Sequence, residues 1–398
     1  MLFIKQIQKN LVLAILFLLP LYLIKFKFVW LSFNLVEILI FILFLLWIFN
    51  KNTKYNILNT KCNIPIILIF TGLFFSVIAN NNYYIGLGAI KGWFIFPIIF
   101  GIIFYESMKE DESLLGKSWL ALLFSGVAVS MMGIVYKFSG LLTYDGRLHI
   151  FYDSPNQLGM FLAPIFIVGL VLFLRENLYW RKLLFLAGLF LLAVNLYFTY
   201  SYGTWMALAV AITVVFWLKH KTLRSRVGIL ILVFLAAIAI GQMRSQKMAD
   251  LENMGGRSSI DSRIMIWKAA GLMIESNPLF GIGPGNFQNK YLEYQKYFPP
   301  YLEWAVPQPH NLFLAFWLEA GFLGLVGFVF LLVQFFKDNK KAIENNHLYG
   351  TLCFAVMLYL LVHGLIDTTY WRNDMAIIFW TIISINTFLS SKGKAQGD

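Results

Sequence analysis

Long apolar runs separated by short polar segments make up most of the chain, and one polar interval is far longer than the others. A membrane-spanning helix needs about 20 mostly apolar residues, and the runs predict about twelve helices, at residues 8–24, 28–49, 63–79, 86–105, 118–138, 157–174, 183–200, 203–218, 228–241, 312–336, 348–366 and 375–390. The interval from Gln242 to Asn311 holds roughly 70 residues, whereas helices in bundles are usually joined by about 2 to 8. We therefore predict an all-α polytopic membrane protein whose chemistry lies in or near this interval.

Composition supports the membrane class. The 398 residues are 59% hydrophobic and only 13% charged, with a mean hydropathy of +0.71, whereas globular domains carry about 25% charged residues. The net charge of +12 comes from short basic clusters between the apolar runs, where membrane topology requires them. We therefore expect contact with membrane lipids and no nucleic-acid partner.

The same basic clusters predict the orientation. Lys and Arg in the short segments on one side outnumber those on the other by about three to one, which puts both termini in the cytoplasm and the long interval outside. Lysines precede the first apolar run, as in a signal peptide, but the segment Lys25–Trp30 offers no small-residue cleavage site, so the run should stay as a helix. We expect residues 1–398 to form a single membrane domain, with residues 242–311 as a loop that caps its external face.

The long interval has its own helix signals. Ser258–Asp261 fits a capping box, and apolar residues follow at helical spacing until Asn277–Pro278, which predicts an amphipathic helix with Arg263 in its first turn. Gly281–Gly285 is rich in glycine and predicts a sharp loop. A second helix is expected at 286–297.

His310 is the first candidate for chemistry, because Asn311 is suited to cap the helix that starts at Leu312. The imidazole would then lie beside the positive end of a helix dipole, which favours its neutral form. A neutral imidazole can act as a general base. The alternative is that His310 only hydrogen-bonds to the loop backbone; His149 ranks second for the base.

Three external arginines, Arg147, Arg257 and Arg263, are candidates for phosphate binding, because a guanidinium binds phosphate oxygens in a bidentate manner. Each could equally be a surface arginine. Arg147 lies in a loop that leads to the helix near residue 157, for which Asn156 is the expected cap.

Two acidic residues in or next to predicted membrane helices, Asp367 and Glu319, extend the candidate set. His363 and Asp367 are four residues apart at the end of a predicted helix, so they would share one face as a structural pair or as part of a site. Glu319 lies about two turns into its helix, near Gly321 and Gly324, and could pair with an arginine or accompany close helix packing.

Several common chemistries lack their motifs. The sequence has no GxxxxGK[ST] phosphate loop, no HExxH zinc motif and no GxSxG elbow. Cys62 and Cys353 are predicted to lie near the cytoplasmic side without metal-ligand spacing. We expect no disulfide, no metal site and no cofactor.

Taken in order, several of these segments resemble the O-antigen ligase and polymerase superfamily. The matching segments are Arg147, Pro155–Gly159, Arg263-x-x-x-Trp267, Asn277–Phe287, Pro309-His310-Asn311-x-Phe313 and Glu319-Ala-Gly321-x-x-Gly324. The resemblance covers most of the chain and implies a fold like that of the C-type glycosyltransferases, in the bacterial inner membrane with a periplasmic active site.

The resemblance implies a metal-independent, inverting glycosyltransferase. The donor would be a glycan on undecaprenyl diphosphate, and the acceptor a sugar of lipid A-core for a ligase, or a second lipid-linked glycan for a polymerase. His310 would take the proton of the acceptor and Arg263 would assist catalysis. Arg147, Arg257, Asn156, Asn311 and Tyr202 would contact substrate. A transporter of lipid-linked sugars is the reading from another class, but no internal repeat supports it.

One segment departs from the family pattern. Many members carry Ser-Arg-Gly at an outer turn between two central helices, where this chain reads Ser201-Tyr202-Gly203. A tyrosine cannot replace a cation. Either Arg147, Arg257 or Lys247 compensates, or the donor is held differently.

Overall fold

The computed structural model describes residues 2–28, 31–50, 62–219, 259–299 and 305–392. These residues are mostly helical, which confirms the all-α fold class. The α-helices are α1 (Leu2–Phe17), α2 (Leu35–Phe49), α3 (Asn63–Ala79), α4 (Tyr83–Ile90), α5 (Phe96–Glu110), α6 (Ser113–Phe138), α7 (Pro155–Arg175), α8 (Tyr179–Phe198), α9 (Tyr202–Lys219), α12 (Ser259–Ser276), α13 (Phe287–Tyr294), α14 (Leu312–Asn345), α15 (His347–Gly364) and α16 (Asn373–Ser391). Shorter elements are η1 (Leu19–Leu23), η3 (Lys91–Ile95), η4 (Gln295–Tyr297), β1 (Lys25–Phe28) and β2 (Leu31–Asn34).

The long apolar helices confirm a multi-pass membrane protein. By length and composition, seven described helices could cross a membrane, and three shorter apolar helices accompany them. The predicted helix at 228–241 lies outside the described residues. The number twelve therefore stays a prediction.

The first two predicted spans are interrupted in ways that the apolar pattern did not indicate. The α1 helix ends at Phe17, because Pro20 sits in the first turn of the short helix η1 and a proline has no N–H to continue an α-helix. The predicted helix at 28–49 is wrong in its first part, where β1 and β2 form an antiparallel hairpin with Phe26 opposite Phe33. The helix α2 starts only after Asn34, whose side chain forms a capping box with Glu37.

The predicted elements of the long interval are present, with small shifts. The α12 helix begins at Ser259, so Arg263 is its fifth residue and lies just beyond the first turn; Ser258 lies outside the described residues. Gly281, Gly283 and Gly285 all have positive φ angles, which confirms the sharp loop because glycine adopts them at little cost. The second helix is α13 followed by η4. A separate apolar core forms here. It contains α12 residues such as Ile266, together with Phe287 and Tyr291 of α13 and Leu318 of α14.

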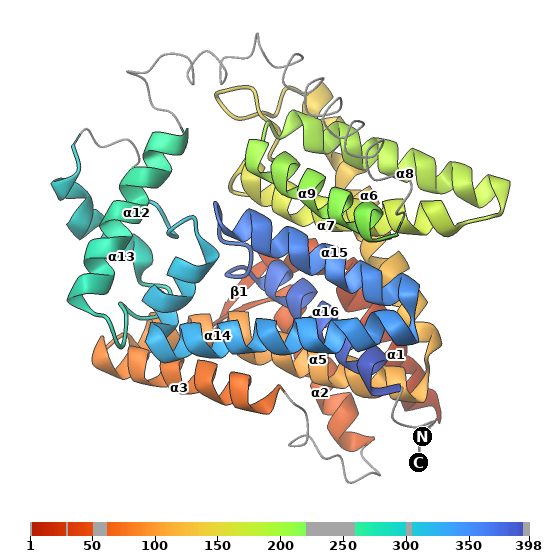
Figure 1. Cartoon of the computed structure of the whole chain (residues 1–398), viewed down its shortest axis with the longest axis horizontal. Helices are drawn as coiled ribbons and strands as arrows, with labels where there is room; N and C mark the ends of the chain where they lie inside the picture. Colours follow the sequence, from red (N-terminus) through yellow and green to blue (C-terminus); the bar gives the residue numbers. More distant parts are fainter. Residues whose placement is uncertain (1, 29–30, 51–61, 220–258, 300–304, 393–398) are drawn as a thin grey trace.

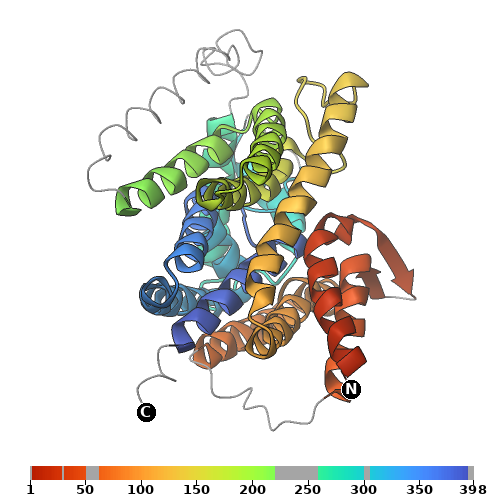
Figure 2. The ribbon, with the colours of Figure 1, turned by 90° about the vertical axis from the view of Figure 1, so that its right-hand side faces the viewer.

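One end of the helix bundle carries a group of ion pairs, and the other end carries α12 and α13 (Figure 1). Lys5 and Lys9 of α1 pair with Glu110 and Asp111, at 2.8 and 3.1 Å, and Lys392 pairs with Glu112. These pairs join the start of α1, the turn between α5 and α6, and the end of α16. In Figure 1 this terminus end lies at the right, while α12 and α13 lie at the left, which we call the loop end. Figure 2 looks at the bundle from the right of Figure 1, with α1 and α2 in red on one side and the blue C-terminal helices on the other.

The helix α14 is broken near the loop end, and backbone from the segment between α12 and α13 fills the break. Gly321 has φ 69° and ψ −179° inside the helix, so the α-helical hydrogen bonds are lost there. The amide of Phe322 donates instead to the carbonyl of Leu279 at 2.9 Å, and the amide of Ile282 donates to the carbonyl of Leu318. The segment before α13 is therefore tied into a membrane helix by backbone hydrogen bonds.

Side chains complete this junction. Glu319, buried to 1% exposure, accepts the amide of Gly285 at 2.9 Å; no arginine pairs with it in the described part of the chain. Close packing of α14 on α3 is confirmed, because a Cβ added at Gly72 would lie 2.3 Å from the carbonyl oxygen of Ala320. Asn80 and Asn82, just after α3, donate to the carbonyls of Gly281 and Pro284.

Candidate active site

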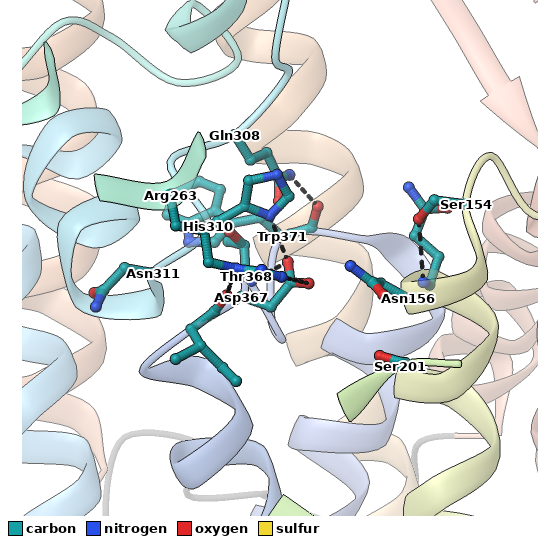
Figure 3. Close-up of polar contacts among 12 residues, drawn as sticks. Ser154, Asn156, Ser201, Arg263, Gln308, His310, Asn311, Asp367, Thr368 and Trp371 are labelled. Atoms are coloured by element: carbon teal, nitrogen blue, oxygen red, sulfur yellow. Dashed lines mark hydrogen bonds and ion pairs between the residues drawn. The ribbon is translucent and has the colours of Figure 1, made fainter. Parts of the chain in front are cut away.

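His310 and Asp367 form a pair at the loop end of the bundle. The Nδ1 atom of His310 lies 2.9 Å from Oδ1 of Asp367, and the two side chains face each other in Figure 3. Asp367 is 3% exposed, whereas the side chain of His310 is 30% exposed. No other hydrogen bond of the imidazole is found among the described residues, so Nε2 is the ring nitrogen available to a ligand.

The backbone around His310 is held in a conformation that a histidine seldom adopts. Its φ angle is +47°, in the left-handed region, which costs about 1 kcal/mol or more and persists only where the surrounding contacts hold it. Trp267 of α12 donates from Nε1 to the carbonyl of His310 at 3.3 Å, and Gln308 donates to the carbonyl of Trp371 at 2.7 Å. The loop carrying His310 is thereby attached both to α12 and to the turn that carries Asp367.

Asn311 caps α14, as predicted. Its Oδ1 accepts the amides of Phe313 and Leu314, both at 3.0 Å. Its Nδ2 donates to the carbonyl of Leu365, two residues before Asp367. Both polar atoms of the side chain thus bind backbone and fix the start of α14 against the end of α15; substrate contact by Asn311 stays a prediction.

Asp367 is also beside Arg263. The Nη2 atom of Arg263 lies 3.9 Å from Oδ2 of Asp367, and Nε of Arg263 donates to the carbonyl of Ile366 at 2.8 Å. Burial would raise the pKa of Asp367, but the charge and hydrogen bond of His310, together with Arg263, lower it below its ordinary value. The carboxylate therefore stays ionised at neutral pH and can stabilise an imidazolium.

Arg147 is anchored in a similar way from another part of the chain. Its Nε donates to the carbonyl of Thr199 at 2.8 Å, and Nη2 donates to Oδ1 of Asn156 at 2.9 Å. Nη1 lies 3.8 Å from Asp145. Burial lowers the pKa of Arg147, the charge of Asp145 raises it, and the charge of Arg263 lowers it, so the pKa lies below its ordinary value.

The expectation that Asn156 caps α7 is wrong. Ser154 is the cap, accepting the amide of Gln157, and Pro155 occupies the first turn. Proline favours the first helical position, so the cap must precede it. The side chain of Asn156 is thereby left to hold Arg147.

The start of α9 contacts the residues that anchor these two arginines. A Cβ added at Gly203 would lie 2.5 Å from Cδ1 of Ile366 and 3.5 Å from Nε2 of His363, so a larger residue there would require the Ile366 side chain to move. Ile366 is the residue whose carbonyl holds Arg263, and Thr199, just before this turn, holds Arg147. Tyr202 packs its ring edge-on against Trp205, with centroids 5.5 Å apart.

Other predicted residues have different partners. The Nδ1 atom of His149 lies 2.7 Å from the carbonyl oxygen of Tyr152. The expected pairing of His363 with Asp367 is not made, because α15 ends at Gly364 and Asp367 turns toward His310. His363 is instead buried within 2.8 Å of the hydroxyl of Tyr359. Arg257 and Lys247 lie outside the described residues.

Sequence reasoning missed that Asp367 is the partner of His310. The two residues are 57 positions apart, and no helical or strand spacing connects them. The only signal was an acid at the end of a membrane helix, where a charge needs a partner.

The arrangement can perform one kind of step well. An imidazole whose Nδ1–H is held by a carboxylate presents the lone pair of Nε2 as a base. The two anchored guanidinium groups provide positive charge that can stabilise a leaving phosphate. Figure 3 shows His310 and Asp367 from one side of the bundle facing Asn156 and Ser201 from the other. Within the part of the chain that the structure describes, no group of three or more His, Cys, Asp or Glu is arranged to hold a metal.

Comparison with known proteins gives two matches. A family model described as O-Antigen ligase matches residues 187–329. A curated "O-antigen ligase" of Salmonella typhimurium (strain LT2) is 25% identical over 268 residues, which cover 64% of this chain and 63% of that protein. The match thus spans less than two-thirds of the relative's length. The family range includes Arg263 and His310, whereas Arg147 and Asp367 fall outside it.

Proposed function

Because the family model and the Salmonella relative support membership of the O-antigen ligase superfamily, we propose that this chain is a ligase-type glycosyltransferase. It would move a glycan from undecaprenyl diphosphate to a sugar of lipid A-core, without a metal and with inversion at the anomeric carbon. The acceptor oxygen attacks that carbon from the side opposite the diphosphate. The bond from the carbon to the diphosphate oxygen breaks, and undecaprenyl diphosphate leaves with the bonding electrons.

The pair of His310 and Asp367 is the observation that carries this proposal. A sugar hydroxyl is a weak nucleophile, and removal of its proton during attack is worth about 10² to 10⁴ in rate. Nε2 of His310 would accept that proton, while Asp367, 2.9 Å from Nδ1, keeps the other nitrogen protonated and stabilises the imidazolium that forms. Asp367 acts through His310 and is therefore a positioning residue.

Arg263 and Arg147 would bind the diphosphate. Each uses Nε on a backbone carbonyl, of Ile366 and Thr199 respectively, so the side chain is oriented before a ligand arrives. Negative charge grows on the diphosphate as the bond breaks, and fixed cations stabilise it most at that moment. We propose that Arg147 compensates for the tyrosine at position 202, since its Nε is bound at the same turn. Arg257 and Asn156 would assist, Asn156 by holding Nη2 of Arg147.

The site would face the periplasm. Lys and Arg are concentrated in the short segments on the side of the two chain ends, which favours the cytoplasm for that side. The candidate residues gather at the opposite, loop end of the bundle. Residues 242–311 would then cap the periplasmic face of a single domain in the inner membrane. Energy for transfer would come from the diphosphate linkage.

A polymerase of the same superfamily is the second candidate. It would use the same base and the same arginines, because only the acceptor differs, a lipid-linked glycan in place of lipid A-core. The choice is therefore made by an assay with purified protein that offers one lipid-linked donor and either acceptor. Transfer to lipid A-core supports the ligase, and elongation of the lipid-linked glycan alone supports the polymerase.

His310→Ala tests the chemistry in the same assay. We expect normal membrane insertion and a loss of transfer of about 100-fold or more, the lower end of the contribution of a general base. His149→Ala is the matched control, since His149 is a loop histidine whose Nδ1 lies 2.7 Å from the carbonyl oxygen of Tyr152 rather than beside a carboxylate. Wild-type transfer by His310→Ala would remove His310 from the mechanism.

A further inference from the structure

Four aromatic residues gather where α8 meets α9, at the loop end of the bundle. The rings of Tyr197 and Trp205 are stacked, with centroids 6.1 Å apart and planes inclined by 10°. Tyr200 lies 5.8 Å from Tyr197, and Tyr202 lies edge-on to Trp205 at 5.5 Å. We call Tyr197, Tyr200, Tyr202 and Trp205 the aromatic turn.

Trp205 anchors the aromatic turn to the helix bundle. Trp205 is buried, and its Nε1 donates to the carbonyl of Leu196 at 2.9 Å. The three tyrosines are only partly buried. Tyr200 has a φ angle of +48°, an unfavourable conformation for a residue with a bulky side chain. Such backbone strain is often found at functional sites.

The segment of the aromatic turn contacts the backbone anchors of both arginines of the site. Thr199, within the turn, accepts Nε of Arg147 through its carbonyl. Gly203, next to Tyr202, packs directly on Ile366, whose carbonyl accepts Nε of Arg263. A ligand whose phosphates meet both guanidinium groups would therefore bring its neighbouring chemical group against these rings.

We propose that the aromatic turn is a binding subsite for a sugar ring of the donor glycan, the ring closest to the diphosphate. The proposal rests on the proposed function, because it takes the donor to be a lipid-linked glycan. The face of an aromatic ring carries negative potential, which attracts the C–H groups on the face of a pyranose. Uncharged aromatic rings suit a sugar rather than a phosphate. The cations for the phosphates would be Arg147 and Arg263, which are anchored next to the aromatic turn. Many family members have an arginine at the position of Tyr202. In this chain the position would contact the sugar, which explains a tyrosine there.

Aromatic residues also anchor proteins at the membrane interface, and the test must separate the two roles. Two ligands are compared on the purified protein: the lipid-linked glycan isolated from the native cells, and undecaprenyl diphosphate, which has no sugar. Tyr200→Ala and Tyr202→Ala should weaken binding of the glycan-bearing ligand by about 3- to 10-fold. Binding of undecaprenyl diphosphate should be unchanged. Tyr200→Phe and Tyr202→Phe, which keep the ring faces, should bind both ligands nearly as wild type does.

Tyr84→Ala is the matched control, because Tyr84 is 80% exposed at the start of α4, near the same end of the bundle. It should leave both affinities unchanged. Equal weakening of both ligands by the alanine variants would overturn the proposal in favour of contact with phosphate or lipid. Unchanged binding of both would overturn it in favour of an interface anchor. A wild-type protein that binds neither ligand would refute the proposed function itself.

Discussion

Asp367→Asn is the most informative single substitution, because it changes one charge and almost no volume. Asparagine is close in shape to aspartate, so the hydrogen bond from the Thr368 amide, 2.8 Å from Oδ1, can be kept. The change removes the charge beside Nδ1 of His310. It also permits the amide to donate to Nδ1, which would put the ring proton on Nε2 and block the base.

The magnitude follows from the distances. Two unit charges about 4 Å apart attract by roughly 4 kcal/mol at an effective dielectric constant of about 20. Asp367 lies 2.9 Å from His310 and 3.9 Å from Arg263, but the side chain of His310 is 30% exposed, and water weakens the attraction. We therefore expect a loss of about 3 kcal/mol in transition-state stabilisation, or a fall in kcat between about 100- and 1,000-fold.

The assay is single-turnover transfer by purified protein, with size-exclusion and thermal unfolding profiles to check folding. Asp111→Asn is the matched control: Asp111 lies 3.1 Å from Lys9 at the terminus end of the bundle, away from the candidate site, so kcat should change less than about threefold. The reasoning about the pair fails if folded Asp367→Asn protein keeps kcat within about threefold of wild type.

Three further predictions follow from the contacts. Arg263→Lys should lower kcat/KM by about 10- to 100-fold in the transfer assay, because lysine keeps the charge but loses the Nε bond to Ile366 and the planar fork; full activity would mean that Arg263 is only a surface charge. Gly321→Ala should lower the free energy of unfolding by about 1 to 3 kcal/mol, since φ is +69° and the new Cβ would lie 2.6 Å from the carbonyl oxygen of Leu279; an unchanged melting temperature would contradict the break in α14. Asn311→Ala should cost about 1 kcal/mol of stability through loss of the cap of α14, measured by denaturant or thermal unfolding, and a neutral result would show that other contacts fix the start of that helix.

Much of the fold was predictable because apolar length and basic clusters are local signals. The helix α3 matches its predicted range, and the cap at Asn311 follows from one residue before an apolar run. The strand β2 was hidden inside the apolar run 28–49. The strand β1 falls mostly in the gap before that run, where the alternating Lys25-Phe26-Lys27-Phe28 is typical of a strand. The cap of α7 was misassigned because Asn156 was preferred over Ser154, although Pro155 marks the first helical position.

The site was only half predictable, because its decisive contacts join distant segments. His310, Arg263 and Arg147 could be picked by residue type and resemblance. The pairing of His310 with Asp367 depends on how α14 and α15 pack, and the approach of Arg147 depends on the turn before α9. No spacing along the chain encodes such contacts.

The break in α14 has a consequence for how this protein can be recombined. The carbonyl of Leu318 accepts the amide of Ile282, the amide of Phe322 donates to the carbonyl of Leu279, and the carboxylate of Glu319 accepts the amide of Gly285. A chimera that exchanges the segment between α12 and α13 alone would leave these groups unpaired inside a membrane helix, at a cost of several kcal/mol. Segments 278–285 and 318–322 should therefore be exchanged together when parts of this protein are recombined with a relative.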